Sequence, residues 1–426
     1  MKNLHALSLL FFAALSMSCE QEKNTEAPAP YGPVPSQEQL DWYDMEMNAF
    51  IHFTINTFTD KEWGYGDESP ELFNPTNLDT DQWMSTLKDA GFSGAILTAK
   101  HHDGFALWPS KYTEHDIAAS PYKDGKGDLV KEVSQSAKKY GLEFGVYLSP
   151  WDRNRADYGE PSYVDYYRDQ VTELFTGYGP VFEMWFDGAN GGDGYYGGAN
   201  EERKIDRETY YNWPKTIAMA KEIQPQVLFF SDAGPDLRWV GNERGIGGET
   251  HWNTISTDTL YAGKSDIGDI LQTGSPDGKN WVPAEVNTSI RPGWFYHASE
   301  DSLVRTPENL FELYLTSVGR GSTLLLNIPP DRRGLFHEND VAALQGFRKL
   351  LDSVFAENLA KNATAVANTS RGETPVYAAD KVLDGDTETY WATNDGVTTG
   401  SIELTWEAPQ KLNYLVLKNS VQKLMT

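Results

Sequence analysis

The chain has 426 residues, a formal net charge of −26 at pH 7 and a hydrophobic content of 39%. This length predicts one large domain and a smaller one. The negative charge excludes nucleic acid as an expected partner, because phosphate binding needs a basic surface. Neutral ligands such as sugars are compatible with that charge, and the 13 tryptophans favour pockets lined by aromatic rings.

The N-terminus has the pattern of an export signal. Lys2 precedes the apolar run Leu7–Leu15, and small residues then lead to Cys19, the only cysteine. The run is too short to span a membrane. The pattern is similar to a bacterial lipoprotein box, although the leucine stands one position early. Ordinary cleavage near Ser18 is the alternative.

This pattern predicts an exported bacterial lipoprotein, located in the periplasm or on the outer-membrane surface. Residues 1–19 are the expected signal peptide, and contact with a membrane is expected only through a lipid anchor at Cys19. The charged residues 20–23 resemble signals that carry lipoproteins to the cell surface. Residues 20–37, rich in Pro, Ala and Glu, predict a flexible tether.

Strand and helix patterns alternate over the next 300 residues. Hydrophobic periodicity and end signals predict helices at 79–91, 130–140, 211–223 and 308–319. Strands are expected at 48–53, 94–100, 144–149, 181–187, 227–231, 283–287 and 322–328. Such repeated pairs predict an α/β fold, a (β/α)8-type barrel spanning residues 38–357. A doubly wound open sheet is the alternative, but the chain has no Gly-rich phosphate loop after the first strand.

The segment 181–188 is the most informative strand, because its two faces differ completely. Side chains alternate along a strand, so one face is apolar, with Phe182, Met184 and Phe186. The other face carries an indole and two carboxylates, from Trp185, Glu183 and Asp187. Asp187 ends the strand, and the C-terminal ends of barrel strands are where such enzymes place their chemistry. An Asp-Gly turn is the alternative interpretation.

Polar side chains come at or just past the ends of four predicted strands: His52, His101, His102, Tyr147, Ser149 and Asp187. Packing alone does not explain such a set. Adjacent histidines on a strand face opposite ways, and the chain has no His-x-x-x-His or Cys-x-x-Cys spacing, so no metal is expected in the active site. The absence of Gly-x-Ser-x-Gly argues against a serine hydrolase of the α/β type.

Carboxylates, imidazoles and aromatic rings in one pocket are typical of a glycoside hydrolase. Sugar hydroxyls need directional donors and acceptors, sugar CH faces stack on indoles, and hydrolysis needs two carboxyl groups. Asp187 is the expected first carboxylate. Composition leaves four candidates for the second: Asp236, Glu243, Glu249 and Glu285.

Several motifs together resemble the α-L-fucosidases of glycoside hydrolase family 29, over residues 42–351. They are His52, Glu62-Trp63, Thr98-Ala99-Lys100-His101-His102-Asp103-Gly104-Phe105, Tyr147-Leu148-Ser149-Pro150-Trp151, Met184-Trp185-Phe186-Asp187-Gly188 and Leu325-Leu326-Asn327-Ile328-Pro329-Pro330. The resemblance implies a retaining exo-enzyme that removes terminal L-fucose with Asp187 as nucleophile and requires no cofactor. It also implies that fucose is held by His52, Glu62, Trp63, His101, His102, Tyr147 and Trp185.

Two further segments resemble the subgroup restricted to branched α-1,3/1,4 linkages. The loop 234–243 contains Arg238 and ends at Glu243, which the resemblance implies is the acid/base. The segment 285–294, with Arg291 and Trp294, would line the rim that holds the rest of the glycan. Arg238, Arg291 and Trp294 are therefore expected to bind substrate. The glycine-rich insertion 191–207 has no assigned role.

The C-terminal segment 358–426 is expected to form a second domain. Residues 378–392 resemble the opening of a discoidin-like β-sandwich, often a carbohydrate-binding module, and the segment is too short for a complete one. Asp384 and Asp386 stand where such modules often hold structural Ca²⁺. An Asp-Gly-Asp turn without an ion is an equal alternative.

Two other functions fit the same pocket. A sugar-binding lipoprotein without activity would have lost a carboxylate, yet Asp187 and Glu243 are both present. A different retaining exo-glycosidase on the same barrel, such as an α-galactosidase, is the third candidate. Activity on aryl fucoside, aryl galactoside and a branched fucosylated oligosaccharide would distinguish the three.

Overall fold

The computed structural model describes residues 26–418 and divides them into two compact units. The larger unit is Pro30–Glu357; the smaller contains residues 26–29 and 358–418. The expected signal peptide, the lipid site at Cys19 and the first part of the tether lie outside the described residues. Residues 26–36 have no helix or strand. No helix in the described part of the chain is long and apolar enough to cross a membrane.

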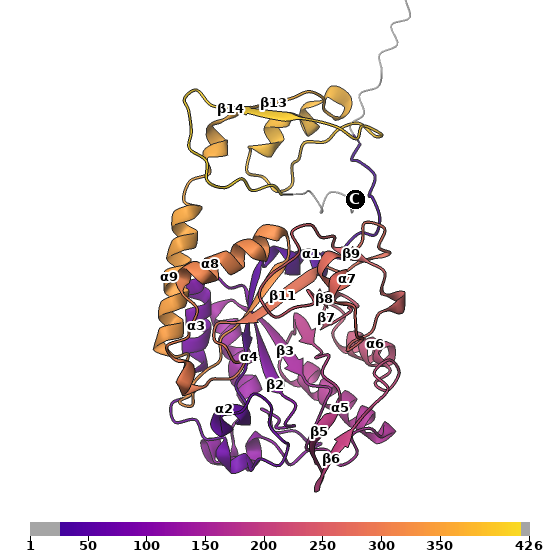
Figure 1. The fold of residues 1–426 in the computed structure, drawn as a ribbon, viewed down its shortest axis with the longest axis vertical. Coiled ribbons are helices and arrows are strands. Elements are labelled where there is room, and N and C mark those ends of the chain that lie inside the picture. The colour runs from indigo at the N-terminus through magenta and orange to yellow at the C-terminus, as the bar shows by residue number, and fades with distance from the viewer. Residues whose placement is uncertain (1–25, 419–426) are drawn as a thin grey trace, which may run out of the picture. The chain divides into compact units, whose positions relative to one another are not determined.

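The larger unit is built on a closed barrel of parallel strands, ordered β1-β12-β11-β8-β7-β4-β3-β2 (Figure 1). This confirms the predicted (β/α) barrel over the open sheet. The strands are β1 (Met47–Ile51), β2 (Gly94–Lys100), β3 (Glu143–Leu148), β4 (Glu183–Trp185), β7 (Leu228–Ser231), β8 (Leu237–Trp239), β11 (Ala284–Ser289) and β12 (Thr323–Asn327).

Helices surround the barrel, and several begin and end where their sequences predict. In α3 (Thr80–Ala90) the Asp79 carboxylate accepts from the backbone N–H groups of residues 81 and 82, and Gly91 ends the helix with φ 93°. α4 (Leu129–Tyr140) ends in the same way at Gly141, with φ 67°. The other helices of the larger unit are α1 (Gln37–Asp44), α2 (Ile55–Thr59), α5 (Pro161–Gly177), α6 (Trp213–Ile223), α7 (Gly268–Thr273), α8 (Pro307–Thr316) and α9 (Glu338–Val354).

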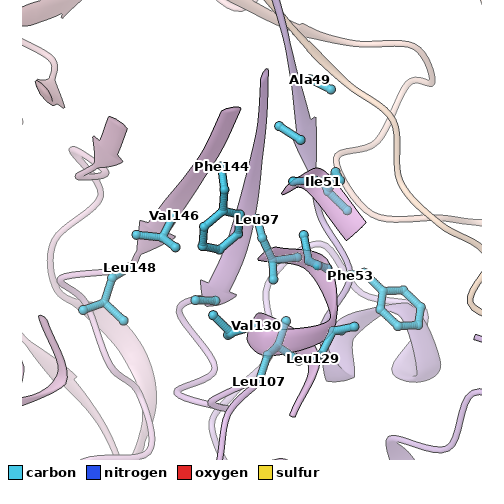
Figure 2. Packing of buried hydrophobic residues seen from close by; sticks show 14 of the residues in the cluster. Ala49, Ile51, Phe53, Leu97, Leu107, Leu129, Val130, Phe144, Val146 and Leu148 are labelled. Carbon is cyan, nitrogen blue, oxygen red and sulfur yellow. The ribbon is translucent and has the colours of Figure 1, made fainter. Parts of the chain in front are cut away.

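The strands separate two apolar layers. Outward side chains such as Ile51, Leu97 and Val146 pack against the helices, as Figure 2 shows. Inward side chains fill the barrel itself with a second cluster: Trp42, Phe50, Ile96, Tyr147, Trp185, Leu228, Phe230, Leu237 and Leu325. Trp42 belongs to α1, so this helix contributes an indole to the barrel interior.

Strand β4 largely follows the predicted alternation. Met184 and Phe186 belong to the outer layer, while Trp185 lies in the interior cluster. Phe182 is an exception, because it precedes the strand and packs against the interior cluster beside Gly94 and Gly145, which have no side chains there. The predicted outward position of Phe182 was therefore wrong.

The insertion 191–207 contains an antiparallel hairpin of β5 (Gly192–Tyr196) and β6 (Ala199–Arg203). The remaining strands of the larger unit, β9 (Thr254–Ile255) and β10 (Asn280–Trp281), form another antiparallel pair. The β5–β6 hairpin is anchored by Trp151, whose Nε1 donates to the hydroxyl of Tyr196 in β5 at 2.8 Å. The insertion is thus an ordered element beside a predicted site segment.

The smaller unit contains one antiparallel pair in its described residues, β13 (Thr364–Ala367) and β14 (Ile402–Thr405). Around it are short 3-10 turns. Asp384 accepts from the Asp386 backbone N–H at 3.0 Å and from the Thr389 hydroxyl at 2.6 Å, and Asp386 accepts from the backbone N–H of residue 388. These contacts favour the turn over the Ca²⁺ interpretation, and residues 26–418 contain no cluster of His, Cys, Asp or Glu suited to a metal ion.

Candidate active site

Asp187 follows β4 directly and is held by two donors. The Tyr147 hydroxyl donates to Oδ2 at 2.9 Å, and the backbone N–H of Ala189 donates to Oδ1 at 2.7 Å. Burial raises the pKa of Tyr147 well above its ordinary value, so the phenol remains a donor. Donors on both oxygens stabilise the ionised carboxylate that a nucleophile requires.

His101 and His102 both reach the site, although adjacent residues on a strand would face opposite ways. The reason is that β2 ends at Lys100, so the alternation of the strand does not extend to them. Their ring centroids are 4.1 Å apart, and the His102 Nε2 lies 4.0 Å from the Asp187 Oδ2. The strand argument that separated the two histidines was therefore wrong.

In His52 and His102, a hydrogen bond at Nδ1 determines whether Nε2, the nitrogen that faces the pocket, carries a proton. The Ser149 hydroxyl donates to the Trp151 carbonyl, so it accepts from His102 Nδ1 at 2.7 Å. The Asn327 amide nitrogen is used on other acceptors, so its oxygen accepts from His52 Nδ1 at 2.8 Å. Both histidines then present an unprotonated Nε2, an acceptor for a sugar hydroxyl.

His101 has the opposite arrangement. The Asn56 amide nitrogen lies 3.5 Å from its Nδ1, which leaves the protonated Nε2 as a donor. Burial lowers the pKa of all three imidazoles: to about 3 for His52, to about 4 for His102 and well below the ordinary value for His101. The site therefore offers neutral donors and acceptors, which suit sugar hydroxyls.

Glu243 follows β8 and is electrostatically coupled to Asp187. Desolvation raises the pKa of its carboxyl, and the negative charge of Asp187 raises it further, while a hydrogen bond with Trp294 lowers it. The net shift is upward. A raised pKa is the property that a general acid needs at neutral pH.

The other three candidates for the acid have contacts or exposure that set them apart from the site. Asp236 binds Lys221 at 2.9 Å and accepts from the backbone N–H of residue 229. The Glu249 side chain is 88% exposed and lies 3.7 Å from Arg320. Glu285 is wholly buried inside the barrel and accepts from the Trp185 indole. Glu243 remains as the candidate at the site, and the charge of Asp187 contributes to its raised pKa.

Glu62, Trp63 and Trp294 form the rim of the site. Glu62 accepts from the backbone N–H groups of residues 294 and 295 and lies 2.7 Å from His297 Nε2, so it fixes the turn that carries Trp294. The Trp294 ring lies 5.2 Å from His52. Trp63 is 52% exposed, and its ring meets His102 edge-on at 5.4 Å, leaving an indole face for a sugar.

Arg238 does not join the site, contrary to the prediction. Leu237 and Trp239 contact the interior cluster, so Arg238 between them faces the opposite side of β8. It is fully buried and donates to the backbone carbonyls of residues 252, 271 and 282. Its guanidinium therefore holds together the segment that follows β8 instead of binding substrate.

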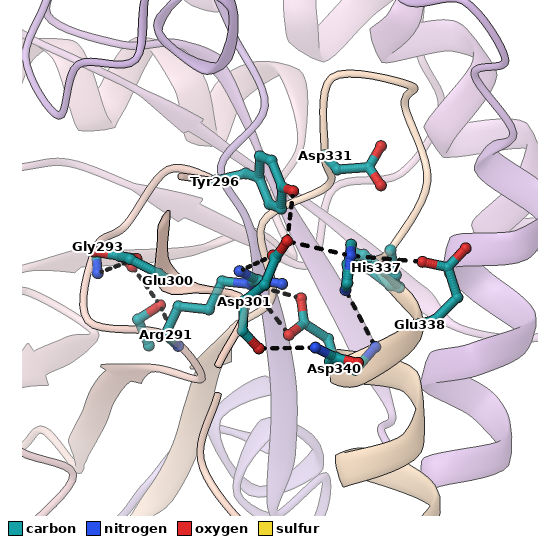
Figure 3. Close-up of polar contacts among 12 residues, drawn as sticks. Arg291, Gly293, Tyr296, Glu300, Asp301, Asp331, His337, Glu338 and Asp340 are labelled. Carbon is teal, nitrogen blue, oxygen red and sulfur yellow. Dashed lines mark hydrogen bonds and ion pairs between the residues drawn. The ribbon is translucent and has the colours of Figure 1, made fainter. Parts of the chain in front are cut away.

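Arg291 was also predicted wrongly as a substrate contact. Its guanidinium is buried, with Nε 2.9 Å from Asp340 and Nη1 2.9 Å from Asp301, as Figure 3 shows. Tyr296 donates to the same Asp301. Asp301 and Asp340 thus pair with Arg291 inside the protein, and this ion-pair network fixes the start of α9 and the turn after β11.

Two residues at the site were not predicted individually. Asn327, inside a recognised motif, orients His52 and also donates to the Trp294 carbonyl at 2.8 Å. Asp232 follows β7 and accepts from the backbone N–H of Gly263 at 2.7 Å. A Cβ on Gly188 would lie 2.1 Å from its Oδ2, so Asp232 packs directly against the loop after Asp187. Burial raises the pKa of Asp232 to about 6.

Comparison with known proteins identifies the family. The family model described as Alpha-L-fucosidase matches residues 30–353. The chain belongs to the α-L-fucosidase family. It is 39% identical to Alpha-L-fucosidase 1 of Arabidopsis thaliana over 97% of this chain and 80% of that protein.

Solved structures agree with this assignment. A Ruminococcus gnavus family 29 fucosidase in complex with fucose is 34% identical, with a TM-score of 0.79 over 90% of this chain and 80% of that one. A family 29 member from an unknown rumen bacterium is 53% identical, with a TM-score of 0.76 over 79% of this chain and 60% of that chain. The protein is thus a glycoside hydrolase, an α-L-fucosidase, and its chemistry needs no cofactor. The comparisons do not favour an α-galactosidase.

Proposed function

We propose that the enzyme is a retaining exo-α-L-fucosidase in which Asp187 is the nucleophile and Glu243 the acid/base. Asp187 attacks C1 of fucose while protonated Glu243 gives its proton to the leaving oxygen; ionised Glu243 then deprotonates the water that resolves the glycosyl-enzyme. The observation that carries this proposal is the doubly hydrogen-bonded Asp187 carboxylate, coupled to a Glu243 whose pKa is raised.

The fucose is held in the proposed complex by residues that line this pocket. His52 and His102 accept from sugar hydroxyls, His101 donates, and the indoles of Trp63 and Trp294 cover the rim. Glu62, Tyr147 and Trp185 complete the proposed set. Mixed donors and acceptors of fixed protonation state suit a ring with several hydroxyls.

We further propose that the physiological substrate carries fucose in branched α-1,3/1,4 linkage. The support is the resemblance of residues 234–243 to the loop of the restricted subgroup, together with Trp294 at the rim beside Glu243. Contacts with the sugar that flanks fucose lower the barrier when they strengthen in the transition state. Trp294 and the Glu243 loop are the proposed source of those contacts.

A substrate panel tests this proposal. We expect branched α-1,3/1,4-fucosides to react at least about 100-fold faster, by kcat/KM, than α-1,2-fucosides or aryl fucosides, since about 3 kcal/mol of remote binding is enough. Aryl galactoside should not react. Efficient cleavage of α-1,2-linked fucose would contradict the linkage proposal, and a preference for galactoside would contradict the assignment of the sugar.

For location, we propose an exported lipoprotein held at a membrane by a lipid on Cys19. The support is the sequence pattern of residues 1–19. The full-length protein should partition into detergent when expressed with its signal, and Cys19→Ser should release it as a soluble species because the thiol that carries the lipid is gone. Unchanged partitioning of Cys19→Ser would contradict the anchor.

For the segment 358–418, we propose a discoidin-like module that binds carbohydrate. The support is the resemblance of residues 378–392, and the antiparallel pair β13–β14 is compatible with a fragment of a β-sandwich. The acidic turn at Asp384 holds its own backbone, so no ion is included in this proposal.

A further inference from the structure

Two glutamates that the proposed mechanism does not use lie inside the barrel. Glu183 of β4 and Glu285 of β11 are both 0% exposed. Each accepts from a different indole: Trp42 Nε1 donates to the Glu183 Oε2 at 2.7 Å, and Trp185 Nε1 donates to the Glu285 Oε1 at 2.8 Å. The two carboxyls are also close enough to hydrogen-bond to each other across the barrel.

The remaining oxygens require a proton. Glu183 Oε1 and Glu285 Oε2 are buried, and no N–H or O–H group elsewhere in residues 26–418 donates to them. Neither carboxyl forms an ion pair with a lysine or arginine in that range. Two ionised carboxylates in contact would repel strongly in an apolar interior, whereas one proton between them converts the repulsion into an O–H···O hydrogen bond.

The surroundings support the protonated state. The interior cluster around the pair is aromatic and aliphatic. Titratable groups on the neighbouring elements are Tyr147 of β3, Asp187 beyond β4, and Arg238 of β8, which faces away from the interior cluster and donates to backbone carbonyls. Burial and the neighbouring carboxyl raise the pKa of Glu183 well above its ordinary value, and burial raises the pKa of Glu285 to about 7. No cation in the described chain offsets these effects.

The pair is connected to the active site through Trp185. The Trp185 ring stacks on Phe230 at 4.1 Å and lies 5.5 Å from the ring of Tyr147, whose hydroxyl donates to Asp187. Rotation of the indole about its side-chain bonds would break both ring contacts. The acceptor that prevents this rotation is Glu285, because it holds the single N–H group of the indole.

We propose that Glu183 and Glu285 share one proton and act as positioning residues, fixing the Trp185 indole beneath the fucose pocket and, through it, Tyr147. The proposal rests on the proposed fucose site for its effect on binding. The proton sharing itself is independent of substrate. The pair also links α1, which supplies Trp42, to the base of the site.

Two substitutions separate proton sharing from positioning. Glu285→Gln keeps an oxygen for Trp185 and supplies an N–H group for Glu183, so it replaces the shared proton with an amide hydrogen. Glu285→Leu has similar volume but offers Trp185 no acceptor. Glu143→Gln, at the exposed start of β3, is the matched control for loss of one carboxyl from a barrel strand.

The first measurement needs no substrate. Raised carboxyl pKa values make the contribution of this pair to the free energy of unfolding fall as pH rises from about 4.5 through 7, because the folded state retains protons that the unfolded state releases. The buried histidines contribute with the opposite sign, so the contribution of the pair is measured as the difference between variant and wild type. We expect Glu285→Gln to remove this contribution, so that its free energy of unfolding relative to wild type rises with pH, and to remove an infrared carbonyl band of a protonated carboxyl at neutral pH. Glu143→Gln should change neither. A wild-type slope and band in Glu285→Gln would overturn proton sharing.

The second measurement is inhibition by free fucose together with kcat. We expect Glu285→Gln to stay within about threefold of wild type in both, and Glu285→Leu to raise the fucose inhibition constant at least about tenfold, since the indole loses its acceptor. Wild-type fucose inhibition in Glu285→Leu would overturn the positioning role. If Glu285→Leu does not fold, Glu285→Met, which also offers the Trp185 indole no oxygen acceptor, replaces it under the same criterion. Absence of fucose inhibition in wild type would contradict the fucose site alone.

Discussion

At the scale of single residues, the two carboxylates of the site are distinguished by what surrounds them. Asp187 has hydrogen-bond donors on both oxygens, which suits an ionised nucleophile. Glu243 is desolvated beside that negative charge, which raises its pKa and suits an acid. The two proposed roles therefore follow from the surroundings of each carboxylate, since both side chains carry the same functional group.

Azide rescue should distinguish these roles. Asp187→Ala should lower kcat by roughly 10³-fold or more, and azide should restore turnover with the inverted β-fucosyl azide as product, because azide replaces the attacking group. Glu243→Ala should retain activity on substrates with good leaving groups, which need no proton, and azide should give the retained α-product. Product configuration is determined by NMR.

The acid/base assignment has a direct counter-test. Wild-type kcat/KM of Glu243→Ala on a branched oligosaccharide would show that another group supplies the proton. Glu249→Gln is a control that removes an exposed carboxyl from the same stretch of the chain, and its kcat/KM should match that of wild type. A retaining enzyme also requires the two carboxyl groups to lie about 5 Å apart.

At the scale of elements, three buried neutral imidazoles follow the ends of β1 and β2, and their burial lowers the stability of the fold at low pH. The folded pKa values of His52 and His102, about 3 and about 4, lie below that of an unfolded histidine. The folded state therefore binds fewer protons, and the associated stability is present above pH 6.5 and is lost as pH falls toward 4.

Thermal unfolding measured from pH 7 to pH 4 checks this. We expect the Tm of His102→Gln relative to wild type to rise as pH drops below 6.5, because the variant lacks one group whose protonation favours the unfolded state. His297→Gln provides a control of opposite sign. The pKa of His297 is raised, through its hydrogen bonds to Asp60 and Glu62, so its contribution is present at low pH and lost as pH rises. Equal slopes in all three proteins would contradict the account.

Elements with strong local signals were predictable from sequence, and those that depend on distant partners were not. β2 matched its predicted residues, and α3 and α4 ended at the expected glycines, because capping and periodicity are local. β8 lies within residues 234–243, which were predicted to be a loop, so this strand was missed. It has three residues and contains a buried arginine whose acceptors come from residues 252–282.

The site was predictable to a similar extent. The structure brings Asp187 and the histidines together as expected, because they follow strong strands; their roles in the reaction stay predictions. Arg238 and Arg291 were misjudged because they lie in segments that resemble substrate-contacting segments, and only the fold reveals their internal carbonyl and carboxylate partners. Asp232 could have been found by the same rule as Asp187, since it directly follows the predicted strand 227–231. The partners of Glu183 and Glu285 could not, because nothing local indicates which strands face each other across a barrel.

At the scale of the whole molecule, the two units differ in how much they can bury. The barrel has a closed sheet and two apolar layers, whereas the described part of the smaller unit has one two-stranded pair, which is marginal on its own. The active-site residues belong entirely to residues 30–357. Activity should therefore depend on the barrel alone.

Limited proteolysis tests this division. Cleavage is expected near residue 358, with loss of the segment beyond it, and the remaining barrel should keep its kcat on aryl fucoside within about twofold, because no proposed site residue is removed. The undigested enzyme is the control. A C-terminal segment that resists protease as long as the barrel does, or a large loss of kcat on trimming, would contradict the expectation.

The filled barrel also limits the direction from which water can reach the active site. Trp185, Phe230 and Phe50 occupy the space beneath Asp187, and each is at most 6% exposed. Water cannot approach the glycosyl-enzyme from that direction, so it arrives from the side through which the cleaved glycan departs. The departing sugar and the incoming water would thus use the same opening of the site. In the proposed mechanism, an alcohol that enters ahead of water would become the new partner of fucose, so hydrolysis and fucosyl transfer would compete directly.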